Sequence, residues 1–132
     1  NILKILTLLI RHSQDSSKSD RLLSRKALEM KRLSNVFEYI NQNYAEHLTL
    51  ADAAEMAYMS PNYFSQYFKK VTGQNFSDYL NGLRIKKAQD MLHDTNSSVI
   101  DVAMACGFRN MSNFYRMYKK YTGTTPSART DK

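Results

Sequence analysis

An internal repeat is the feature that most constrains the fold of this chain. Residues 49–73 and 98–123 show the same order of residue types, from an opening Ser or Thr to a closing Lys-Lys-x-Thr-Gly run. The corresponding pairs include Thr49 and Ser98, Asp52 and Asp101, Ala54 and Ala103, Phe64 and Phe114, and Gly73 and Gly123. The turn in the second copy is one residue longer. A match that preserves caps, core positions and basic ends together indicates a duplicated unit.

Each copy has the pattern of a helix, a tight turn and a second helix. In the second copy, Ser98 and Asp101 resemble a capping box, and Gly107 can take the positive φ that ends a helix. Apolar residues fall at helical spacing on both sides of this glycine: Val99, Val102, Ala103 and Cys106 before it, and Phe114, Met117, Tyr118 and Tyr121 after it. This arrangement predicts a helix-turn-helix unit.

The first copy differs mainly at its turn, where Tyr58 stands in place of Gly107, so this turn must close without glycine. Ser60 and Pro61 then form a good start for the next helix. The residues expected to point inward from that helix are Phe64, Tyr67, Phe68 and Val71.

The outward side of the second helix is polar in both copies. In the first copy it carries Asn62, Ser65, Gln66, Lys69 and Lys70, and in the second Asn110, Ser112, Asn113, Arg116 and Lys119. Such side chains suit the base edges and phosphates of nucleic acid.

Composition favours an all-helical fold of about one domain. The 132 residues include only four Gly and two Pro, and no strand-like alternation recurs. The net charge of +7 fits an anionic partner, but it equally fits an ordinary basic surface. Cys106 is the single cysteine, so an internal disulfide is excluded, and a buried apolar role is expected for it.

A longer helix is expected between the two units, from residue 76 to 93. About 17 residues at 1.5 Å each give roughly 25 Å. A spacer of that order could hold two helices near the ~34 Å repeat of the major groove. The same helix could equally be a plain core element that joins two subdomains, and both roles are compatible.

The N-terminal third is less defined. The chain begins at Asn1 rather than Met, from which we expect it to be part of a longer protein. An apolar helical face at residues 2–10 is too short to span a bilayer, and we expect it to pack on an upstream domain or on a second copy. Residues 13–20 are Ser-rich and are expected to form a linker. An amphipathic helix that includes Leu33, Val36, Phe37 and Ile40 then runs to about Tyr44. Leu22, Leu23, Ala27 and Leu28 could begin this helix or a separate one.

Enzymatic chemistry is not favoured. His12, His47 and His93 lack metal-ligand spacing, and no Gly-rich phosphate loop or paired carboxylates occur. Asp52 and Asp101 occupy capping positions rather than catalytic ones. We therefore expect no cofactor, no metal and no catalysis.

The chain resembles the DNA-binding domain of AraC/XylS-family bacterial transcription regulators. The matching motifs are Ser60-Pro61-x-Tyr63-Phe64-Ser65-x-x-Phe68-Lys69-Lys70-x-x-Gly73, Phe76-x-x-Tyr79-Leu80-x-x-x-Arg84-x-x-x-Ala88-x-x-x-Leu92, Val102-Ala103-x-x-x-Gly107-Phe108, Ser112-x-Phe114, Tyr118-Lys119-Lys120 and Gly123-x-x-Pro126. The resemblance implies seven helices, two helix-turn-helix units and a bridging helix. It also implies a sequence-specific regulator in the bacterial cytoplasm, associated with the nucleoid.

The resemblance implies that both second helices enter adjacent major-groove segments of a non-palindromic site of about two turns. Expected base-reading residues are Asn62, Ser65, Gln66, Met111, Ser112, Asn113, Tyr115 and Arg116. Expected phosphate contacts are Ser60, Lys69, Lys70, Arg84, Asn110, Lys119 and Lys120. RNA polymerase, and a second copy bound through an upstream domain, are further suggested partners. The alternative is a basic helical module that binds an acidic protein.

The same resemblance suggests a domain plan. Residues 1–14 would be the last helix of an upstream effector or dimerisation domain, 13–30 a linker and the start of the first helix, and 31–132 the DNA-binding domain. After Pro126 the family usually has an aromatic residue and an Arg, whereas this chain has Arg129 and Thr130 without the aromatic. We therefore expect a short or frayed closing helix.

Overall fold

The computed structural model describes the backbone of residues 2–127 and the side chains of residues 19–127. Within these residues the chain is all-helical, which confirms the predicted fold class. The helices are α1 (Ile2–Asn43), α2 (Leu50–Met56), α3 (Pro61–Thr72), α4 (Phe76–Asp94), α5 (Val99–Ala105) and α6 (Met111–Thr122). A 3₁₀ turn follows at Pro126, which is buried. The rest of the expected closing helix falls in residues 128–132, outside the described part.

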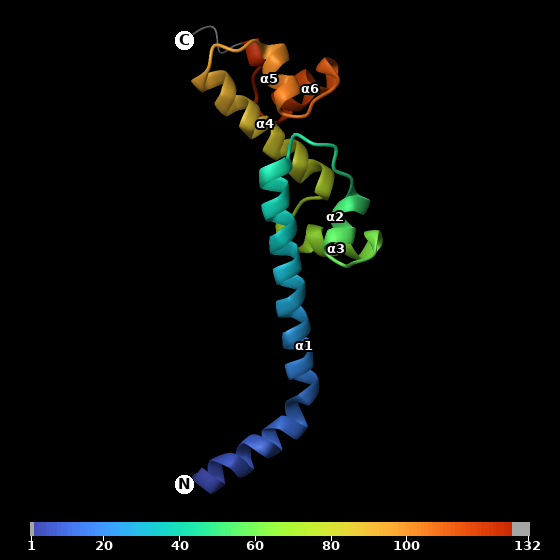
Figure 1. Cartoon of the computed structure of the whole chain (residues 1–132), viewed down its shortest axis with the longest axis vertical. Helices are drawn as coiled ribbons and strands as arrows, with labels where there is room; N and C mark the ends of the chain where they lie inside the picture. The colour runs from blue at the N-terminus through green and yellow to red at the C-terminus, as the bar shows by residue number, and fades with distance from the viewer. Residues whose placement is uncertain (1, 128–132) are drawn as a thin grey trace.

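Helix α1 is one continuous element where a linker and a later helix start were expected. Figure 1 shows it passing α2 and α3 and continuing beyond them, away from α5 and α6. Residues 13–20 are helical, so the expectation of a break there is wrong. The segment contains neither Gly nor Pro, and Ser and Asp lower helix propensity by only a fraction of a kcal/mol each, about 0.5. A composition typical of linkers therefore did not interrupt the helix.

Two hydrophobic cores lie along α4, one for each unit. The first includes residues of α1, α2, α3 and α4, among them Val36, Ile40, Ala53, Phe64, Phe68, Phe76 and Leu80. The second gathers residues of α4, α5, the turn after α5, and α6: Ile85, Ala88, Leu92, Val102, Ala103, Cys106, Phe108, Phe114 and Tyr118. Because the two halves of α4 serve different cores, this helix is both a core element and the spacer between the units.

The two turns reach a similar backbone conformation with different residues. Tyr58 has a φ of 57° and Gly107 a φ of 95°. A Cβ atom at Gly107 would lie 2.7 Å from the carbonyl oxygen of Ala45, so no side chain fits there. Tyr58 is 79% exposed, and its ring lies 5.0 Å from the guanidinium of Arg32. The first turn closes without glycine because its side chain is free to point into solvent, at a strain cost of roughly 1–2 kcal/mol.

The two units are also joined by direct contacts across α4. The Tyr121 hydroxyl of α6 donates to the carbonyl oxygen of Asp78 at 3.0 Å. The Tyr121 ring lies over Gly82, where an added Cβ would be 3.4 Å from the ring.

No helix among the described residues combines the length and apolar character that crossing a membrane requires.

Candidate nucleic-acid interface

Helix α3 is built to present one polar side outward. The Ser60 hydroxyl accepts from the backbone N–H of Tyr63 at 3.2 Å and so caps the first turn, with Pro61 at the first helical position. Phe64 and Phe68 are fully buried and fix the rotation of the helix. Gly73, with a φ of 80°, ends it with a hydrogen bond from its N–H to the carbonyl oxygen of Lys69.

Helix α6 repeats this construction. The Asn110 side-chain oxygen accepts from the N–H of Asn113 at 3.1 Å, and Phe114 and Tyr118 hold the inner face. Gly123 has the same φ of 80° as its counterpart in α3. The hydroxyl of the preceding residue, Thr122, donates to the carbonyl oxygen of Tyr118 at 2.7 Å, just as that of Thr72 donates to Phe68 at 2.8 Å. The structural repeat therefore includes the residues that cap the two helices.

Most predicted base-reading side chains lie outward on α3 and α6. Five are exposed: Asn62, Gln66, Ser112, Tyr115 and Arg116. Ser65 and Asn113 are half-buried, at the edges of their faces. Met111 is also half-buried and packs against the second core, so a purely base-reading role does not describe it. Val71, expected to point inward, is 41% exposed.

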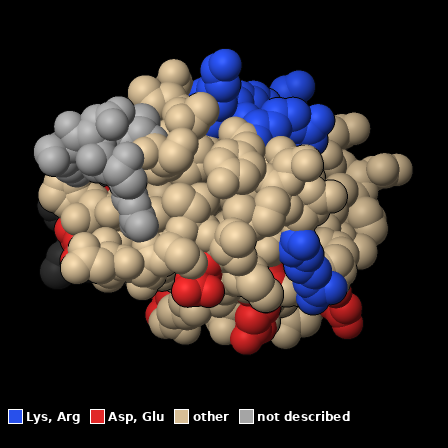
Figure 2. All heavy atoms as spheres, turned by 90° about the horizontal axis from the view of Figure 1, so that it is seen from above, with Lys and Arg blue, Asp and Glu red and all other residues tan. Residues whose placement is uncertain are grey.

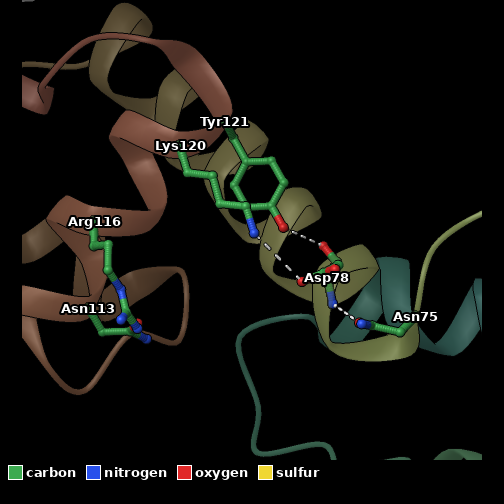
Figure 3. Close-up of polar contacts among 6 residues, drawn as sticks. All are labelled: Asn75, Asp78, Asn113, Arg116, Lys120 and Tyr121. Carbon is green, nitrogen blue, oxygen red and sulfur yellow. Dashed lines mark hydrogen bonds and ion pairs between the residues drawn. The ribbon is translucent and has the colours of Figure 1, made fainter.

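Arg116 is held by a neighbour on its own helix. Its Nη2 donates to the side-chain oxygen of Asn113 at 2.9 Å, one turn earlier (Figure 3). The two predicted base-reading residues therefore form one hydrogen-bonded pair on the outer side of α6. The bond uses one of the five guanidinium N–H groups and leaves the others available to a ligand.

The basic residues at the ends of α3 and α6 are exposed, as predicted. They are Lys69, Lys70, Lys119 and Lys120. Lys120 differs from the others because its Nζ lies 4.0 Å from an oxygen of Asp78 (Figure 3). Figure 2 shows, on the face seen from above, that most Lys and Arg side chains gather along one edge and most Asp and Glu along the opposite edge.

Arg84 has a different place from the one predicted. Its Nε donates to the carbonyl oxygen of Tyr44 at 2.6 Å, and its Nη2 donates to that of Glu46 at 2.8 Å. Burial lowers the pKa of this guanidinium. The side chain therefore ties the loop after α1 to the middle of α4, a structural role that the sequence did not predict, and its phosphate contact stays a prediction. The α4 motif could not reveal this role, because the two acceptors are backbone carbonyl oxygens of residues far away in the sequence.

Sequence reasoning also missed the interactions of two tyrosines with polar groups. Tyr121 was assigned to the inner face, but it is 36% exposed and reaches across to Asp78. The Tyr63 hydroxyl donates to the carboxylate of Glu29 in α1 at 2.8 Å. Both contacts join segments that lie far apart in sequence, and spacing along the chain cannot reveal them.

Comparison with known proteins places this geometry in a family. Residues 53–131 match the model of a helix-turn-helix domain family, which is more than half of the chain. The melibiose operon regulatory protein of Escherichia coli K12 is 34% identical over 94 residues, covering 71% of this chain and 31% of that protein. The chain spans less than half of the length of the curated relatives it matches.

Solved structures agree with this match. The DNA-binding domain of the global transcriptional factor AdpA, in complex with a target DNA, superposes with a TM-score of 0.72 at 29% identity, covering 75% of this chain and 90% of that one. A regulator with an AraC-type DNA-binding domain from Chromobacterium violaceum superposes with a TM-score of 0.71 at 25% identity, covering 77% and 91%. The chain therefore belongs to the AraC/XylS family of sequence-specific, DNA-binding transcription regulators, with α2–α3 and α5–α6 as its two helix-turn-helix units.

Proposed function

We propose that this chain binds duplex DNA with α3 and α6 in two adjacent major-groove segments on one face of the duplex. The observation that carries the proposal is the duplicated polar face of these two helices, mounted on a shared α4. Helix α4 has 19 residues and is about 28 Å long, which approaches the ~34 Å repeat of the groove. The similar DNA-binding domain of AdpA was solved in complex with a target DNA, which supports DNA binding by this fold.

The two half-sites read by this chain should differ. Corresponding outward positions carry different residues: Asn62 and Ser112, Ser65 and Tyr115, and Gln66 and Arg116. Gln suits adenine and Arg suits guanine, so the two units favour different bases at the equivalent place. Because both units belong to one chain, they should lie head to tail on a non-palindromic site of about 20 bp.

Selection of bound sequences from a random duplex pool tests this function directly. We expect one asymmetric motif of about two turns, bound by a single chain, with affinity that falls as salt rises. Palindromic sites that need two chains for any binding would contradict the head-to-tail arrangement. Binding to an acidic protein that duplex competitor does not displace would instead favour a protein-interaction module.

Further partners are proposed for the longer protein. Helix α1 exposes Leu22, Leu23 and Met30 on one side, which fits an apolar face covered by an upstream effector or dimerisation domain, or by a second copy. RNA polymerase is a further proposed partner, in keeping with the regulatory role of the family. The absence of catalysis and the nucleoid-associated cytoplasmic location stay predictions.

A further inference from the structure

An open cavity of about 320 Å³ lies between α1 and the start of α3. Its polar lining comes from Arg25, Glu29 and Arg32 of α1, Tyr58 of the turn, and Ser60 and Tyr63 at the start of α3. Arg25 lies well before residue 53, where the match to the helix-turn-helix family begins. The cavity therefore places α1 residues that lie outside that match next to the first turn of α3, the helix proposed to read DNA.

Both arginines of the cavity are held in place from one side. The Arg25 Nε lies 3.5 Å from a carboxylate oxygen of Glu29, and the Arg32 guanidinium stacks on the Tyr58 ring at 5.0 Å. Each guanidinium has five N–H donors, and these contacts occupy few of them. Arg is suited to bind phosphate through two parallel hydrogen bonds.

Glu29 is the one acidic group in the cavity lining, and its charge is already balanced. It is only 9% exposed, and its Oε1 accepts from the Tyr63 hydroxyl at 2.8 Å and lies near Arg25. The carboxylate thus docks α1 onto α3 and orients Arg25. With two guanidiniums and one carboxylate, the cavity keeps a net positive charge, next to the positive end of the α3 dipole.

The cavity borders the DNA-facing side of α3. Tyr63 lines it, and Gln66, three residues later, is the exposed base-reading candidate of that helix. Residues three apart are neighbours on a helix surface. When Gln66 faces base edges, the cavity faces the sugar–phosphate strand beside that groove. Figure 1 shows α1 continuing past α3 on the side away from the second unit, so this strand lies at the outer end of the site.

We propose that Arg25 and Arg32 bind a DNA backbone phosphate at the outer edge of the first half-site, so that α1 is a third DNA-contacting element beside α3 and α6. The proposal rests on the proposed function, because it takes the position of the duplex from α3. Its ligand is a phosphodiester of the DNA strand. The contact adds affinity without base preference, and it lengthens the footprint on one side only.

Two double variants with the same change in charge provide the test. Arg25→Ala/Arg32→Ala removes the two cavity arginines, whereas Lys26→Ala/Lys31→Ala removes their exposed neighbours on α1, which do not line the cavity. Circular dichroism and melting curves check that both variants fold. Each protein is then titrated on three duplexes: the selected site alone, the site extended by about half a turn beyond the first half-site, and the site extended equally beyond the second.

Wild type and the lysine variant should gain affinity only from the extension beyond the first half-site. The arginine variant should lose that gain and show a salt slope lower by about 1–2. Ethylation interference should locate one or two outer phosphates whose modification weakens wild type but not the arginine variant. If the two double variants bind alike, and ethylation interference is the same for the arginine variant as for wild type, the α1 contact is overturned. The proposed function of α3 and α6 would still stand. Absence of any sequence-selective binding by wild type would overturn the proposed function itself.

Discussion

Tyr121 of α6 donates a hydrogen bond to the carbonyl oxygen of Asp78 in α4 at 3.0 Å, and this contact fastens the second unit to the half of α4 that belongs to the first core. Lys120 reinforces it with an ion pair to the Asp78 carboxylate, at 4.0 Å and partly exposed. Such a pair contributes little by itself, about 0–1 kcal/mol. The orientation of the two units therefore depends on the tyrosine more than on the lysine.

Removal of the Tyr121 hydroxyl should loosen the spacing of the two units. We expect Tyr121→Phe to lower the free energy of unfolding by about 1 kcal/mol, since one hydrogen bond is lost. Wild type should bind more weakly when one base pair is inserted between the half-sites, and the variant should tolerate the insertion better. Tyr39→Phe, on α1 beside α2, is the matched control. An unchanged insertion penalty in Tyr121→Phe would show that the core alone sets the spacing.

The two turns should differ in their sensitivity to changes at corresponding positions. Gly107→Ala combines a positive φ with a 2.7 Å contact to the carbonyl oxygen of Ala45 and should lower the free energy of unfolding by about 2–4 kcal/mol. Tyr58→Gly removes backbone strain but also the stacking of Arg32, worth about 0.5–1 kcal/mol, and should be nearly neutral. Urea denaturation measures both; a large loss in Tyr58→Gly would mean that the Arg32 contact outweighs the strain.

The Cys106 thiol should be unreactive in the folded protein. Its side chain is fully buried, and burial raises its pKa to about 11 from 9.0. At pH 8 the thiolate fraction is then about 100-fold lower than for a free thiol, and access is blocked as well. Iodoacetamide should modify Cys106 only after denaturant is added. Rapid alkylation of the native protein at pH 8 would contradict the burial of this side chain.

The same pKa shift predicts a loss of stability at alkaline pH. The folded-state pKa is raised, so the stabilisation is fully present below pH 9.0 and is lost as the pH rises through about 11. Cys106→Ala should weaken this alkaline dependence in melting curves.

The roles of some residues in this chain could be predicted from local spacing, whereas the roles of others depend on contacts with distant parts of the chain. Ser60, Gly73 and Gly123 act as caps because capping depends on a few neighbouring residues, and that pattern is visible in sequence. Arg84 and Tyr121 bond carbonyl oxygens that any residue could supply, about 40 positions away, so no side-chain motif marks them.

The lysines at the ends of α3 and α6 should contact phosphates rather than bases. Lys69→Ala, Lys70→Ala and Lys119→Ala should each weaken binding to all sequences and lower the salt slope by about 1. Lys120→Ala should change the slope less, because Asp78 already engages its ammonium group. Filter binding across a salt series, on specific and random duplexes, measures this. A changed preference at a single base pair would assign that lysine to base reading.

Arg116 should read a guanine in the second half-site, and Asn113 should position it. The Asn113 oxygen holds the guanidinium at 2.9 Å on the exposed side of α6, and Arg binds the O6 and N7 atoms of guanine through two hydrogen bonds. Arg116→Ala should therefore lose about 1–3 kcal/mol of discrimination at one or two base pairs only. A phosphate contact or a surface ion pair is the alternative role for this side chain.

Sites varied at each base pair of the second half-site distinguish these roles. Asn113→Ala should reduce the same preference partially while the guanine is still favoured, because the arginine remains but is less well oriented. Gln66→Ala, at the corresponding position of α3, is the matched control and should alter preference only in the first half-site. A uniform loss over every variant site, or no loss at all, would show that Arg116 does not read sequence.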